Sequence, residues 1–183
     1  MKLSTFSFKP DSGWSISEFP NLDSKKTLVL VFASPEYMDQ PAALAELVKA
    51  YPKSRLIGCS TAGEIVGPVV NDASLSVAVL QFERSTLAAV SAEIKDADDS
   101  LSAGEQLAKQ LNKKDLRAVF VLSDGLKVNG SELVKGLNAG LPTSVVVTGG
   151  LAGDGDRFQR TWVIRNGKPE CGVITAIGSR GAF

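Results

Sequence analysis

Three short apolar runs constrain the fold of this 183-residue chain more than any other feature of its sequence. They occupy residues 28–32, 118–122 and 144–148, and polar side chains hardly interrupt them. An apolar run of this length is typical of a strand buried on both faces, and such strands lie in sheets that helices cover. The runs therefore predict an α/β protein.

A helical pattern follows the first run. Four apolar residues recur at helical spacing, namely Leu44, Leu47, Val48 and Tyr51. Asp39 is predicted to cap this helix, Pro41 fits its first turn, and Pro52 ends it. Together with a strand at 55–59, the helix predicts two parallel strands joined by a right-handed crossover.

Two hairpins are predicted from short connections. Residues 73–82 and 86–94 are strand-like and only three residues apart, which indicates an antiparallel hairpin. The Asn166-Gly167 pair lies between strands predicted at 160–165 and 171–177, and this dipeptide is a strong hairpin signal.

Two further helices are expected. Asp98 or Asp99 caps the first, and its predicted apolar face consists of Leu101, Leu107, Ala108 and Leu111. Asn129 and Glu132 resemble a capping box for the second, which Gly140 and Pro142 end. The apolar stripe of that second helix consists of Leu133, Val134 and Leu137.

This order of elements predicts a mixed β-sheet with β-hairpins and with helices packed on the sheet, as in a layered α/β sandwich. Residues 1–25 are interpreted as an N-terminal arm or edge segment, because mostly aromatic residues alternate loosely there with polar ones, and two prolines and a glycine interrupt the pattern. Residues 26–183 are interpreted as one domain.

Composition excludes several classes of function. Lys plus Arg and Asp plus Glu both number 20, and no basic stripe is present, so no nucleic-acid partner is expected. No signal peptide and no membrane-spanning run is visible, which predicts a cytoplasmic protein without membrane contact. The chain has no histidine and only Cys59 and Cys171. We therefore expect no catalytic residues, no metal site and no cofactor, and hence no enzyme.

The first candidate site follows the strand predicted at 55–59. It consists of Gly58, Cys59, Ser60, Thr61, Ala62, Gly63 and Glu64. Small residues allow a ligand close to the backbone, amides and hydroxyls could hold a carboxylate, and Glu64 could meet an ammonium group. A tight turn without a ligand is the alternative. For Cys59, a packed strand residue is favoured over a nucleophile, because no neighbouring base is visible in the sequence.

The second candidate site follows the run at 144–148. It consists of Gly149, Gly150, Gly153, Asp154 and Arg157. The glycine spacing does not match a nucleotide-binding fingerprint, and a calcium loop would need a downstream glutamate that is missing. The side chains of Asp154, Asp156 and Arg157 could orient a polar ligand, or an aspartate and the arginine of this loop could pair with each other and only close the loop.

Asp124 follows the run at 118–122 and could bind a ligand or form a turn, and a turn is favoured. Because ligands gather at the carboxyl ends of strands in α/β sheets, the three segments are expected to meet at one edge. The 58–64 and 149–157 loops should then share one crevice.

Two motifs carry a resemblance to a known family. The run from Gly58 to Ile65, and the run from Gly149 to Asp154 followed by a strand and the Asn166-Gly167 turn, resemble the FIST N-terminal domain. The resemblance covers about residues 25–178. It implies a sensory module of bacterial signal transduction that binds small ligands such as amino acids, and a C-terminal FIST domain or a signalling protein as partner.

Three functions are weighed from the sequence. The first is sensing of a small ligand, an amino acid or a related small anion. The alternative is a protein-interaction module without a ligand, whose exposed apolar surface would favour a partner or a homo-oligomer. The third is an enzyme that uses Cys59 or Ser60, for which no base is visible.

Overall fold

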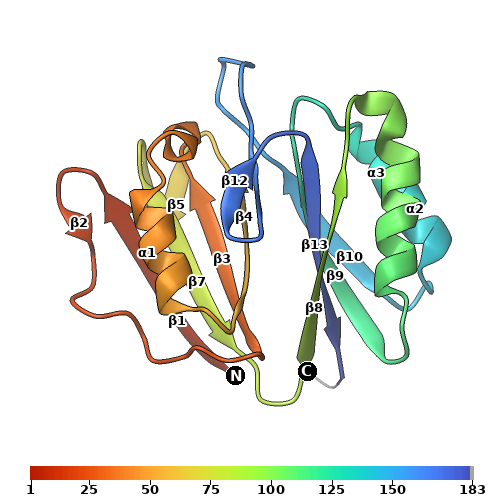
Figure 1. Ribbon diagram of the computed structural model, residues 1–183, viewed down its shortest axis with the longest axis horizontal. Helices are drawn as coiled ribbons and strands as arrows, with labels where there is room; N and C mark the ends of the chain where they lie inside the picture. The colour runs from red at the N-terminus through yellow and green to blue at the C-terminus, as the bar shows by residue number, and fades with distance from the viewer. Residues whose placement is uncertain (182–183) are drawn as a thin grey trace.

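The computed structural model describes residues 1–181 and folds into four layers. A helix covers one sheet, a second sheet packs against the other face of the first, and two helices cover the far side (Figure 1). This arrangement confirms the predicted α/β class, with mixed sheets and helices packed on them.

The first sheet has seven strands in the order β12-β11-β4-β3-β7-β1-β2. Their bounds are β1 Lys2–Lys9, β2 Gly13–Trp14, β3 Thr27–Ala33, β4 Arg55–Ser60, β7 Leu75–Gln81, β11 Val163–Arg165 and β12 Lys168–Glu170. The short 3₁₀ helix η1 (Pro35–Met38) and helix α1 (Ala42–Ala50) connect β3 to β4. These two strands are parallel, as predicted for the strand–helix–strand unit.

The second sheet has four strands in the order β10-β9-β13-β8. Their bounds are β8 Thr86–Glu93, β9 Leu116–Ser123, β10 Val146–Leu151 and β13 Val173–Arg180. The turn η2 (Ala97–Asp99) leads into helix α2 (Ser100–Leu111), and helix α3 (Gly130–Gly140) lies beside α2. A separate small hairpin pairs β5 (Glu64–Val66) with β6 (Val69–Asn71).

The core consists of three apolar layers: one between α1 and the first sheet, one between the two sheets, and one between the second sheet and helices α2 and α3. Alternate residues of a strand point into different layers. Val29 and Val31 of β3 pack toward α1, whereas Leu28 packs between the sheets with Ile57 and Ile177. The run at 28–32 is apolar throughout because both of its faces are covered. No helix within residues 1–181 is both long enough and apolar enough to cross a membrane.

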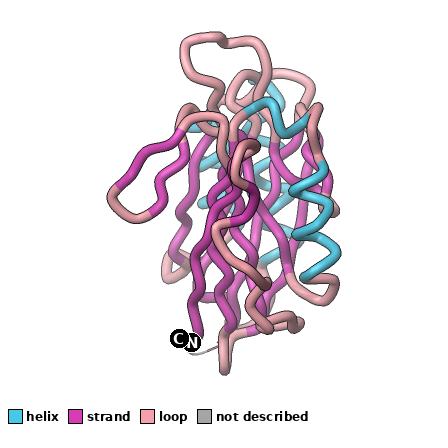
Figure 2. The backbone as a smooth tube through the Cα atoms, turned by 90° about the vertical axis from the view of Figure 1, so that its left-hand side faces the viewer, coloured by secondary structure: helices cyan, strands magenta, loops and turns pink. Residues whose placement is uncertain are grey.

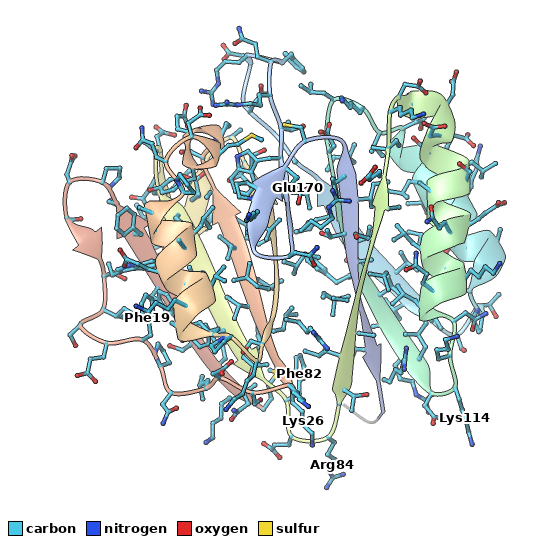
Figure 3. All side chains as sticks on the ribbon, in the orientation of Figure 1. Phe19, Lys26, Phe82, Arg84, Lys114 and Glu170 are labelled. Carbon is cyan, nitrogen blue, oxygen red and sulfur yellow. The ribbon has the colours of Figure 1, made fainter. Side chains whose placement is uncertain are left out.

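The predicted hairpin over 73–82 and 86–94 is wrong. β7 pairs with β3 and β1, and β8 pairs with β13 in the other sheet. Because both edges of β7 are occupied, the short turn between the two strands carries the chain from one sheet to the next instead of back along β7. Phe82 and Arg84 lie at this crossing (Figure 3).

The predicted hairpin at Asn166-Gly167 is present with a different second strand. Both residues have positive φ angles, 53° and 79°, as a tight turn of this kind requires. The returning strand is β12, whereas the segment predicted at 171–177 falls in β13 of the second sheet.

The strand predicted as buried at 144–148 is an exposed edge strand. β10 runs from Val146 to Leu151, and its partner strand within residues 1–181 is β9, in parallel, so Gly149 and Gly150 belong to the strand. Its valines do not indicate burial on both faces, because β10 stands at the end of its sheet among the described residues and most of its residues are exposed.

The helix caps are confirmed in part. The Asn129 side chain accepts hydrogen bonds from the amides of Ser131 and Glu132, as a cap of α3 should. Asp39 instead ends η1, and Pro41 precedes α1. Leu101 and Val134, predicted to face the core, are 40% and 44% exposed because α2 and α3 turn these positions outward.

Helices α2 and α3 approach each other at two glycines. A Cβ atom at Gly136 would lie 2.1 Å from the Leu101 carbonyl oxygen, and one at Gly104 would lie 2.4 Å from the Leu133 carbonyl oxygen. We therefore expect Gly136→Ala to lower the free energy of unfolding by about 1–3 kcal/mol through overpacking, despite the better helix propensity of alanine. Urea unfolding measures this. Gly150→Ala is the control, because a Cβ there would meet nothing within 4 Å, and an equal effect of both variants would contradict the close crossing.

Candidate functional site

A cleft of about 320 Å³ opens where β3 and β4 end. Its walls come from four segments that follow or precede strands, residues 34–36, 61–64, 72–73 and 154–157. The loop between β10 and β11 rises above the strand ends, and other loops gather at the same end of the molecule (Figures 1 and 2). The cleft therefore lies at the carboxyl edge of the parallel pair, where α/β proteins commonly bind ligands.

The two loops predicted to meet do line this cleft together. The Gly153 amide donates to the Ser60 carbonyl oxygen over 2.9 Å, which holds the second loop against the first. Their strands lie in different sheets, β4 in the first and β10 in the second. The loops therefore meet because residues 152–162 carry the chain across from one sheet to the other, and not because their strands are neighbours.

Glu64 is the most buried acid of the cleft, with 1% of its surface exposed. Its Oε1 accepts from the Thr61 hydroxyl at 2.7 Å, and its Oε2 accepts from the Ser74 amide at 3.1 Å and the Ser74 hydroxyl at 2.8 Å. Burial raises the pKa of Glu64 despite these hydrogen bonds, and the nearby charge of Asp72 raises it further. No ion pair joins Glu64 to a cation within residues 1–181.

Acidic side chains predominate around Glu64. The other carboxylates that line the cleft are Glu36, Asp72, Asp154 and Asp156. The cleft also contains one guanidinium, that of Arg157, whose Nη1 donates to Glu36 Oε1 at 2.5 Å and whose Nε donates to the Asp154 carbonyl oxygen. Arg157 holds the pKa of Glu36 below its usual value. The cleft thus keeps a negative excess after this pair is formed.

These carboxylates do not converge on one point. Within residues 1–181, no three His, Cys, Asp or Glu side chains are placed to hold a metal ion. The arrangement is better suited to a larger organic cation, whose hydrogen-bond donors can reach separate oxygens.

Asp154 shapes its own loop. It is 4% exposed, and its Oδ2 accepts from the amides of Gln159 and Arg160 at 2.7 and 2.9 Å. The Arg160 amide is the largest cause of the lowered pKa of Asp154. Arg160 in turn forms a two-pronged ion pair with Asp39. Asp154 is therefore already engaged in ordering the loop, while the Arg157 and Arg160 pairs attach the loop to η1 and the residue that ends it.

The first three residues of the first candidate segment have structural roles and do not line the cleft. Gly58 lies inside β4, where a Cβ would come within 2.3 Å of the Val31 carbonyl oxygen. Cys59 packs between the sheets, and burial raises its pKa to about 12, so it is a thiol at neutral pH. The Ser60 hydroxyl accepts from the Trp162 amide, and the Ser60 and Thr61 amides donate to carbonyl oxygens. Of the predicted segment, residues 61–64 line the cleft.

Asp124 lies outside the cleft and acts as a structural anchor. Its Oδ1 accepts from the amides of Leu126 and Lys127 and from the Thr161 hydroxyl, and its Oδ2 accepts from the Gly172 amide at 2.7 Å. The turn favoured from the sequence is thus present, with two additional long-range contacts.

Gly149 and Gly150 also lie outside the cleft. They line a separate groove between β10 and α3. Gly153 contacts the first loop through its amide. The predicted site residues therefore do not form one site: some line the cleft, Asp124 anchors loops, and Gly149 and Gly150 line the groove.

Five cleft residues, Pro35 among them, were not found from the sequence. Ser34 and Glu36 follow β3, and Asp72 and Ala73 precede β7. Ser74 lies beside them and holds Glu64. A Ser-Pro-Glu sequence directly after the apolar run at 28–32 was a usable signal for the first pair, since it also stands at a strand end. The 72–74 segment precedes a strand and carries no such signal.

The fold and the cleft define a layered α/β domain with a ligand-sized, acid-lined crevice. The model of the FIST N domain matches residues 27–182, and the chain belongs to this family. FIST domains are associated with signal transduction. No curated protein matches the chain closely enough to add a relative to this comparison.

Proposed function

We propose that this FIST N domain is a cytoplasmic sensing module that binds a small ligand with an ammonium group, such as an amino acid, in the cleft above β3 and β4. The observation that carries the proposal is the buried Glu64 carboxylate, which has hydroxyl and amide donors and no cationic partner within residues 1–181. A buried charge without a counter-ion is costly, and an ammonium group would supply one.

The surrounding charges favour an ammonium over a simple anion. Five carboxylates line the cleft (Glu36, Glu64, Asp72, Asp154 and Asp156), and its guanidinium is already paired. This negative excess favours a cation over an anion, most strongly beside Glu64, which is the most buried of the five carboxylates. The carboxylate of an amino acid would have to lie toward Arg157 or the amides of Ala62 and Gly63, which also line the cleft.

The size of the cleft agrees with a ligand of this class. A volume of about 320 Å³ lies at the lower end of the range for small-molecule sites, about 300–1,000 Å³. Binding would reach four chain segments at once, so it could change the position of the 154–157 loop relative to η1. A loop that moves on binding would be the output of such a sensory module, because it couples ligand contacts to a surface change.

A thermal-shift screen with the twenty standard amino acids tests the proposal. At least one is expected to raise the midpoint of thermal unfolding, by the equivalent of about 2.7 kcal/mol at a concentration of one hundred times its Kd. Its N-acetyl derivative, which lacks the ammonium group, should give no shift, whereas its carboxamide, which keeps the ammonium, should retain part of the shift.

Two results would contradict this function. If none of the twenty amino acids or their carboxamides shifts the unfolding midpoint, amino acids are excluded as ligands. If an N-acetyl derivative binds as well as its parent amino acid, Glu64 is excluded as the partner of the ammonium group, even though a ligand has been found.

A further inference from the structure

A second concave surface lies on the helix-covered face of the second sheet, between helix α3 and strand β10. This α3–β10 groove has a volume of about 860 Å³ and shares no lining residue with the cleft. Its lining contains no charged side chain and consists of Val121, Ser123, Gly130, Ser131, Leu133, Val134, Asn138, Val147, Thr148, Gly149, Gly150 and Leu151.

Strand β10 borders the groove with an open edge. It pairs with β9 through all six of its residues and has no strand on its other side within residues 1–181. Sheet edges are normally protected by charged residues, proline or a covering element. β12, the edge strand of the first sheet, has Lys168, Pro169 and Glu170, whereas β10 has the sequence VVTGGL without any of these.

Two exposed glycines lie in this edge strand. Gly149 has a φ of 149°, and a Cβ there would lie 1.8 Å from the Val121 carbonyl oxygen of β9, so this position requires glycine. A Cβ at Gly150 would meet nothing within 4 Å. Because both residues are exposed and have no side chain, the backbone of the strand is accessible at two successive positions. Val134 and Leu151, which are 44% and 50% exposed, provide apolar walls above it.

A polar group without a partner lies in the groove. Ser123 ends β9, is 1% exposed, and its hydroxyl has no hydrogen-bond partner within residues 1–181. Buried hydroxyl groups are nearly always hydrogen-bonded, and each exception needs an explanation. Because β10 lies between β9 and the open edge, the missing partner would have to come from a side chain that the occupant inserts into the groove, and not from the occupant's backbone.

We infer that the α3–β10 groove binds an extended, uncharged peptide segment of a partner protein, which adds to the second sheet as a strand beside β10. Such β-augmentation combines backbone hydrogen bonds to an open edge with pockets for alternate side chains. The six residues of β10 offer an edge of about 20 Å, which suits an extended peptide better than a compact ligand. The uncharged lining selects against charged side chains, because each would lose water without gaining an ion pair.

This inference does not depend on the small-ligand site. A library of random octapeptides displayed on phage, selected on the whole 183-residue chain, identifies binding sequences. We expect enriched peptides with apolar residues at alternate positions and without charge at the centre. A fluorescein-labelled peptide with the consensus sequence then measures affinity by anisotropy.

Two variants with similar exposure separate the groove from the rest of the helical layer. Val134→Glu places a charge in the groove and is expected to weaken peptide binding at least ten-fold. Leu101→Glu is the control on the neighbouring helix, since Leu101 is 40% exposed and does not line the groove. It should leave the affinity unchanged. Both positions are exposed on helices, so both variants are expected to fold, and circular dichroism checks this.

N-methylation of the peptide backbone tests the strand pairing directly. Alternate amides of an added strand face β10, so N-methyl groups at alternate residues should abolish binding and those at the intervening residues should not. Amide hydrogen exchange should slow at residues 146–151 when peptide is bound.

Three binding results would overturn the inference. These are the failure to enrich any sequence, equal loss of binding in both helix variants, and binding that tolerates N-methylation at every position. A stable dimer in light scattering that Val134→Glu dissociates would assign the groove to a second copy of the chain and would equally overturn the partner-peptide inference.

Discussion

Asp124→Ala is expected to lower the free energy of unfolding by about 3–5 kcal/mol. The Asp124 side chain is 2% exposed and accepts four hydrogen bonds, from the amides of Leu126, Lys127 and Gly172 and the hydroxyl of Thr161. Alanine would leave these donors without an acceptor in a mostly buried setting, and an unsatisfied buried donor costs about 1–3 kcal/mol. The loss would reach three segments at once, because these partners follow β9, precede β11 and precede β13.

Urea unfolding followed by tryptophan fluorescence measures this effect. Asp156→Ala is the control, since Asp156 is an exposed loop residue, and it should change the free energy of unfolding by less than about 0.5 kcal/mol. Asp124→Asn should lie between the two, because its amide oxygen can still accept on one side while its NH₂ faces the Gly172 amide. Similar unfolding curves for the Asp124→Ala and Asp156→Ala variants would show that the carboxylate is not an anchor.

The elements that the sequence predicts well are those whose signals are local. The runs at 28–32 and 118–122 form β3 and β9, because an uninterrupted apolar segment has few alternatives to a covered strand. Asn129 caps α3 through contacts only two and three residues away. The Asn166-Gly167 turn depends on the φ angles of two neighbouring residues. None of these requires knowledge of the rest of the fold.

The errors in the fold concern pairings over long distances in the sequence. Whether β7 and β8 pair with each other depends on whether β1 and β3 already flank β7, and a window of the sequence cannot contain that information. The valines at 145–147 look like those of a central strand, but β10 is an edge strand because no other strand of residues 1–181 pairs with its free side. The β-branched side chains indicate a strand here, but the burial of that strand depends on its position in the sheet.

The candidate site was predictable to a similar extent. Thr61, Glu64, Asp154 and Arg157 meet at the cleft, as polar residues after strands are expected to do. Ser60 and Asp124 have the same kind of signal, yet their polar atoms hold the fold together. A polar residue at a strand end is suitable for either role, and only its hydrogen-bond partners distinguish the two.

Glu64→Gln is expected to weaken binding of an ammonium-bearing ligand by about 30- to 100-fold, which corresponds to about 2–3 kcal/mol. Glutamine can keep the local geometry. Its oxygen can accept from the amide and hydroxyl of Ser74, and its NH₂ can donate to the Thr61 hydroxyl oxygen. The variant thus removes the charge and retains the hydrogen bonds. Asp72→Asn, an exposed acid of the same cleft, is the matched control, and a smaller loss is expected there because an exposed charge is screened by water.

The raised pKa of Glu64 gives this prediction a distinct pH dependence. Without ligand, the folded state binds the Glu64 proton more tightly than the unfolded state does, so the contribution of Glu64 to stability is greatest below the ordinary pKa of 4.5 and is lost as pH rises through the folded pKa. The ammonium ligand needs the ionised form, so its affinity should rise with pH over the same window. Glu64→Gln should lack both trends. Urea unfolding and isothermal titration calorimetry at several pH values between 4.5 and 8 measure them. A Glu64→Gln variant that binds the ligand as tightly as the unchanged chain, with the same pH dependence, would exclude Glu64 as the ammonium partner.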